Sequence, residues 1–96
     1  MRGMLAGIWE RHKPEMEERL SVLARTSQAL AERVLTEQER TDAIYAAHKL
    51  AGALGTFGRT EGSDIARLLE RSFEAGATSI SELKEAISRL QKIIEG

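Results

Sequence analysis

The chain has no cysteine, one proline, one tryptophan, one tyrosine and two phenylalanines in 96 residues. The missing cysteine excludes a disulfide scaffold and thiolate metal sites. A formal net charge of −1 argues against a nucleic-acid-binding surface. Apolar runs fall far short of the ~20 residues that cross a bilayer, and the start is too short and too soon charged for a signal peptide. We therefore expect one cytoplasmic domain over residues 1–96, with no nucleic-acid or membrane partner, either alone or within a larger protein.

Capping residues predict where two of the helices begin. Thr36 and Glu39 have the spacing of a capping box, in which each residue satisfies a free backbone donor of the other. This predicts a helix over about 37–55. Ser79 and Glu82 repeat the pattern and predict the start of the last helix.

Glycine and proline mark the remaining borders. Gly58 predicts a turn, Gly62 and Ser63 are predicted to open a third helix, and Gly76 is predicted to end it. Pro14 fits the first turn of a long helix, where its missing N–H costs little.

Apolar residues recur at steps of three and four in each segment, which is typical of amphipathic helices. The residues predicted to form these stripes are Met16, Leu20, Leu23, Ser27, Leu30 and Val34 in the first long helix, Ile65, Leu68, Leu69 and Phe73 in the third, and Ile80, Leu83, Ile87, Leu90 and Ile94 in the last. A short leading helix would carry Leu5, Ile8 and Trp9. The sequence thus predicts an all-α fold, an antiparallel up-and-down four-helix bundle with a short extra N-terminal helix.

The second helix carries a histidine in an unusual setting. At about 100° per residue, its core face consists of Ala43, Ala46, Ala47, Leu50, Ala53, Leu54 and Phe57. His48 lies on the opposite face, with Ala51, Gly52 and Gly55 at i+3, i+4 and i+7. A glycine inside a helix costs roughly 1 kcal/mol relative to alanine, so two of them call for a reason. We interpret Ala51, Gly52 and Gly55 as a small-residue shelf that gives access to the imidazole.

The segment 47–58, with 65–70 after it, resembles the histidine-containing phosphotransfer (HPt) domains of bacterial phosphorelays. The pattern of that family is a histidine, a hydrophobic residue two positions later, and glycines four and often ten positions later. The matching residues are His48, Leu50, Gly52 and Gly58.

The resemblance implies a covalent carrier and not an enzyme. His48 would accept a phosphoryl group from a receiver-domain aspartate and pass it to another receiver, and a neutral imidazole is a competent nucleophile for this step. Its partners would be response-regulator receiver domains or a hybrid histidine kinase. The receiver would supply Mg²⁺ and most of the charge stabilisation, so no cofactor or metal is expected on this chain.

Six more residues have predicted roles around His48. Glu70 occupies the position where related domains place a polar side chain that orients the histidine; the alternative is a solvated glutamate. Ile44 and Tyr45, one turn before His48, would form a docking patch for a receiver, or be covered by the N-terminal helix; we expect some of each. Three cations, Lys49, Arg59 and Arg67, would surround this patch and meet an acidic partner. The alternative is that all three are ordinary solvated side chains.

One departure keeps a second function open. The family usually has lysine three residues after the histidine, whereas this chain has Ala51. A bundle that docks and regulates a receiver without being phosphorylated is therefore the alternative function, and Ala51→Lys is expected to speed transfer modestly.

Two further alternatives are weaker. A histidine-kinase dimerisation domain would have an acidic residue directly after the histidine, where this chain has Lys49. A metal-binding bundle would need inward-facing Glu-x-x-His pairs, and Glu10 and His12 have the wrong spacing. His12 has no glycine shelf and is expected to be an ordinary surface residue.

Overall fold

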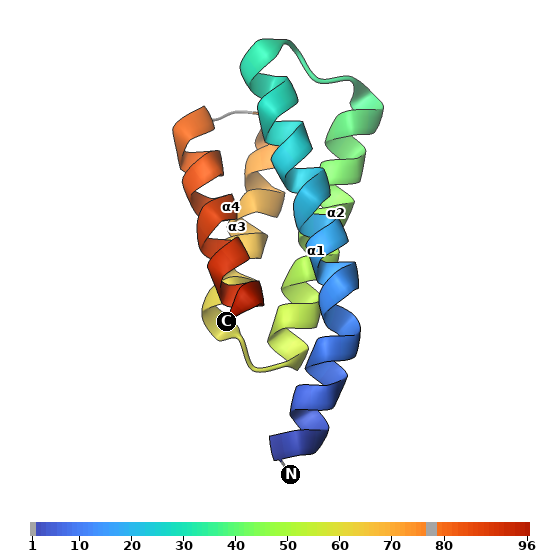
Figure 1. Ribbon diagram of the computed structural model, residues 1–96. Coiled ribbons are helices and arrows are strands. Elements are labelled where there is room, and N and C mark those ends of the chain that lie inside the picture. Colours follow the sequence, from blue (N-terminus) through green and yellow to red (C-terminus); the bar gives the residue numbers. More distant parts are fainter. Residues whose placement is uncertain (1, 77–78) are drawn as a thin grey trace.

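The computed structural model describes the backbone of residues 2–76 and 79–96, and the side chains of residues 7–76 and 79–96. Four helices follow one another along the chain: α1 (Arg2–Glu32), α2 (Glu37–Thr56), α3 (Thr60–Ala75) and α4 (Ile80–Glu95). Successive helices alternate in direction (Figure 1), and the contacts α1 with α2, α2 with α3, α3 with α4 and α4 with α1 close a ring around one core. The predicted all-α four-helix bundle is confirmed.

The prediction of a separate N-terminal helix is wrong, because α1 continues through Pro14. Its first turns extend past the end of the bundle (Figure 1). A proline inside a helix costs about 3 kcal/mol, which is comparable to the gain from burying a large apolar side chain. Trp9 and Met16 lie two turns apart, on either side of Pro14, and both are buried. One unbroken helix places both side chains in the core, and their burial offsets the cost of the proline. Ile8 is half-buried, and the side chain of Leu5 lies outside the described residues.

The predicted apolar stripes form the core with two exceptions. Val34 is exposed because α1 ends at Glu32, and Leu35 in the following loop packs against the core in its place. Leu68 is 56% exposed, because the buried face of α3 is centred on Leu69 and its neighbours, about 100° away. The buried members of the stripes are Met16, Leu20, Leu23, Ser27, Ala43, Ala46, Ala47, Leu50, Leu54, Ile65, Leu69, Phe73, Leu83, Ile87, Leu90 and Ile94, while Leu30, Ala53, Phe57 and Ile80 are half-buried.

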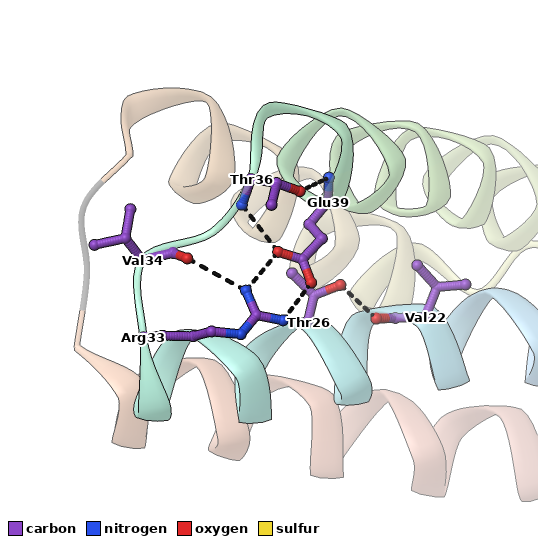
Figure 2. Close-up of polar contacts among 6 residues, drawn as sticks. All are labelled: Val22, Thr26, Arg33, Val34, Thr36 and Glu39. Carbon is purple, nitrogen blue, oxygen red and sulfur yellow. Dashed lines mark hydrogen bonds and ion pairs between the residues drawn. The ribbon is translucent and has the colours of Figure 1, made fainter.

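The predicted capping box at the start of α2 is present and is reinforced by Arg33, the residue after α1 (Figure 2). Thr36 Oγ1 accepts the Glu39 N–H at 3.0 Å, and Glu39 Oε1 accepts the Thr36 N–H at 2.9 Å. The Arg33 guanidinium donates to both Glu39 oxygens, at 2.8 and 2.7 Å. The Arg33 hydrogen bonds first, and the Thr36 N–H second, lower the pKa of Glu39 from 4.5 to about 2.

This network is expected to stabilise the fold at neutral pH and to fail in acid. Since the pKa of Glu39 is lower in the folded than in the unfolded chain, its contribution is complete above pH 4.5 and is lost as the pH falls toward about 2. Thermal unfolding of the wild type and of Glu39→Gln should therefore give a difference in Tm that shrinks across this range. A Tm difference that is unchanged at the acid end would contradict this assignment.

The other helix borders agree with the predictions within two residues. Gly58 and Gly76 both have positive φ, 75° and 72°, which only glycine adopts without strain. The α3 helix begins at Thr60, slightly before the predicted Gly62. Ser79 Oγ accepts the Glu82 N–H at 3.3 Å and caps α4.

Candidate functional site

His48 lies near the middle of α2, on the side that faces away from the core. Its neighbours on the inner face, Ala47 and Leu50, are fully buried, whereas its own side chain is 67% exposed. The helix is fixed by packing on one side, so the exposed ring extends from a rigid base.

Glu70 from α3 contacts the His48 ring, so the glutamate that the family resemblance put beside the histidine lies there. His48 Nδ1 lies 3.1 Å from Glu70 Oε2, and the Glu70 side chain is only 21% exposed. An ionised carboxylate can only accept hydrogen bonds, so this contact favours the tautomer with its proton on Nδ1. In that tautomer the free lone pair is on Nε2, the nitrogen away from the carboxylate.

The three residues of the predicted shelf differ in their surroundings. A Cβ added to Gly52 would meet nothing within 4 Å, so the surface there is open. A Cβ on Gly55, which is also exposed, would lie 3.4 Å from Ser63 Oγ, an ordinary contact with α3.

Ala51 departs from the expectation of an exposed shelf residue, because it is only 4% exposed. The α3 helix covers this side of α2, and Ser63 Oγ donates to the Ala51 carbonyl at 2.8 Å. Ala51 still lines the pocket beside His48.

A shallow pocket of about 330 Å³ lies between the His48 face of α2 and α3. Its lining residues are His48, Ala51, Gly52, Arg67, Glu70, Arg71 and Glu74. The two arginines and Glu74 lie within one turn of Glu70 on α3, so the helix that contacts His48 through Glu70 also brings other charged side chains to the pocket. The sequence singled out Arg67 and missed Arg71.

On the other side of His48, an exposed tyrosine is flanked by two cations. Arg19 from α1 and Lys49 from α2 each lie 5.6 Å from the centre of the Tyr45 ring. Ile44 is half-buried and packs against the core, so the predicted apolar patch is divided between an exposed and a partly covered residue. Nothing in the sequence identified Arg19, because only the packing of α1 on α2 brings it to Tyr45.

The remaining predicted residues lie elsewhere. Arg59 lies over the Trp9 ring, 4.5 Å from its centre, beyond the end of α2. His12 Nδ1 lies 3.0 Å from the Ile8 carbonyl oxygen, and its ring contacts Phe57 edge-on. The structure therefore brings neither residue to His48.

Comparison with known proteins places the chain in a family. The model of the Hpt domain matches residues 8–94. The chain belongs to the Hpt domain family. This membership supports a general role in histidine phosphotransfer within a phosphorelay.

A curated relative covers part of the chain. The HPt domain is 44% identical to Protein RcaC of Microchaete diplosiphon over 62 residues, which are 65% of this chain and 10% of RcaC. The aligned segment thus spans about a tenth of that relative's length. No solved structure gives a significant match.

The part of the chain that the structure describes shows neither a cluster of candidate metal ligands nor a candidate membrane-spanning helix. In that part, no group of three or more histidine, cysteine, aspartate or glutamate side chains is placed to hold a metal ion. No helix found there combines the length and the apolar character that crossing a membrane requires.

Proposed function

We propose that His48 is the phosphoacceptor of this HPt domain, receiving a phosphoryl group from a receiver-domain aspartate and passing it to another receiver. The observation that carries the proposal is the pairing of an exposed ring with a half-buried carboxylate: Glu70 holds Nδ1, and Nε2 is left to react. The domain would act as a carrier that is regenerated by the next transfer and not as an enzyme with its own turnover.

The proposed step needs only groups that the two partners supply. The Nε2 lone pair attacks phosphorus, the P–O bond to the receiver aspartate breaks, and the aspartate leaves as a carboxylate. The ring keeps its Nδ1 proton and becomes a phosphorylated imidazolium, whose positive charge faces the Glu70 carboxylate. Onward transfer reverses these bonds on a second receiver. The Mg²⁺ that phosphoryl transfer requires belongs to the receiver.

The surface around His48 would dock the receiver. Gly52 leaves room for an approaching loop, and Tyr45 provides an exposed aromatic ring with the charges of Arg19 and Lys49 over it. Aromatic residues and arginine are enriched at protein–protein interfaces relative to the rest of the protein surface. A cytoplasmic receiver, alone or within a hybrid histidine kinase, is the partner we propose.

The test is to locate the phosphate. After incubation with an aspartyl-phosphorylated receiver, mass spectrometry at neutral to alkaline pH should find acid-labile phosphate on the peptide that contains His48. Phosphate on His12 instead would overturn the assignment. A receiver that binds the domain without phosphorylating it would favour the binding-only alternative. That alternative stays open because position 51 is alanine and not the usual lysine.

Removing the Glu70 carboxylate is expected to slow phosphorylation without unfolding the domain. Glu70→Ala loses the acceptor that fixes the ring, and a contact of this exposure is worth about three- to tenfold in rate. Glu70→Gln should lose less, because its amide oxygen can still accept a hydrogen bond from the Nδ1–H group. The measurement is the initial rate of phosphate uptake from a fixed receiver concentration.

Glu85→Ala is the matched control for Glu70→Ala, since Glu85 is an exposed glutamate on α4. It removes the same charge away from the site and should leave the rate unchanged. Equal rates for Glu70→Ala and the wild type would show that Glu70 does not position the ring.

A further inference from the structure

The positively charged side chains beside His48 come from α3, whereas the family pattern has a lysine on the same helix as the histidine. A lysine three residues after the histidine would come from α2 itself, but this chain has Ala51 there. Lys49 cannot take its place, because it is directed about 100° away and lies against Tyr45. A phosphoryl group on Nε2 would therefore find no cation on α2 at the usual position.

Two arginines from α3 line the same pocket. Arg67 and Arg71 are four residues apart, so they lie on one face of α3, and both border the pocket together with His48 and Gly52. A helical side chain leans toward the N-terminus of its own helix. Because α3 runs antiparallel to α2 (Figure 1), this lean carries Arg67 toward the level of Gly52, where the surface is open.

Among the side chains that the structure describes, neither arginine makes a strong contact outside the pocket. Arg67 has one exposed contact, 3.8 Å from Asp64, at the long end of an ion pair. No ion pair found among the side chains of residues 7–76 and 79–96 involves Arg71. The carboxylates of Glu70 and Glu74 also line the pocket, and Glu70 is held by the ring. Both guanidinium groups can thus turn toward a new anion without breaking a buried contact.

The geometry points to Arg67 and Arg71 as the phosphoryl-positioning residues of this domain, in place of the absent lysine. This inference rests on the proposed function, since it requires a phosphoryl group on His48. A guanidinium presents a planar fork of N–H donors that matches phosphate oxygens, so two of them can hold the group in the pocket and offset its negative charge.

The inference also changes what is expected of a lysine at position 51. Ala51 lines the pocket, so a lysine there would extend into the space that the two arginines already supply with charge. Ala51→Lys should therefore gain little in the wild-type background and should matter only when the arginines are gone.

The experiment uses phosphoramidate as a small phosphodonor, so that no receiver surface contributes to the result. His48 Nε2 would attack phosphorus, and the P–N bond of the donor would break to release ammonia. The double variant Arg67→Gln/Arg71→Gln is expected to be phosphorylated about three- to tenfold more slowly than the wild type at low ionic strength, with the gap narrowing as salt is added. Its ³¹P resonance should also shift relative to that of the wild type.

Two further variants make the outcome specific. Lys84→Gln removes one exposed cation from α4, which packs against α1 and α3, and should leave the rate unchanged. Adding Ala51→Lys to the double variant should restore most of the rate. Absence of phosphate on His48 in the wild type would refute the proposed function itself. If the wild type is phosphorylated on His48 but the double variant has the same rate and the same ³¹P shift, the role of the arginines would be overturned. The proposed function of His48 would then still stand.

Discussion

His48→Gln is expected to abolish phosphotransfer while leaving the bundle folded. The side chain is 67% exposed and faces away from the core, so glutamine can replace it without a cavity or a buried polar group. Glutamine has no nucleophilic nitrogen, so uptake of phosphate from a receiver should fall to background. Circular dichroism and thermal unfolding should show a Tm within a few degrees of the wild type.

The matched control is His12→Gln on α1. His12 is exposed and contacts the Ile8 carbonyl and Phe57, well away from Glu70. This variant should be phosphorylated at the wild-type rate. Phosphate that persists on the folded His48→Gln protein would mean that another residue is the acceptor.

Gly52→Leu is expected to separate function from stability. A Cβ at this position meets nothing within 4 Å, so a side chain can begin here without displacing a neighbour. Leucine also favours the helix over glycine, by up to about 1 kcal/mol in an exposed position. Because a helical side chain covers the turn before it, leucine at this position would lie over the imidazole and block an approaching receiver. Transfer should slow by about tenfold or more, whereas the free energy of unfolding should stay equal or rise.

Gly7→Leu provides the comparison, because Gly7 is another exposed helical glycine with open space around its Cβ. It should change stability in the same direction and leave transfer unaltered. If Gly52→Leu lowered the Tm sharply and left the transfer rate per folded molecule unchanged, Gly52 would be a packing residue and not an access residue.

The sequence by itself determined the helices, most of their borders and the face of α2 on which His48 is exposed. The capping box of Thr36 and Glu39, the glycines Gly58 and Gly76 with positive φ, and the spacing of His48 and Gly52 are all local features. They depend on residues within a turn or two of one another, and the 3.6-residue period converts such spacing directly into position on the helix. The HPt resemblance rested on residues of this kind.

Only the tertiary structure decided what depends on how the helices pack. The packing kept α1 continuous through Pro14, because burial on both sides of it outweighs the lost hydrogen bond. It buried Ala51 under α3, and it placed Arg67 and Arg71 beside His48 from a separate helix. A single helix's sequence gives the direction of each side chain, but which neighbouring helix meets it, and at which level, follows from the fit of apolar surfaces far apart in the chain.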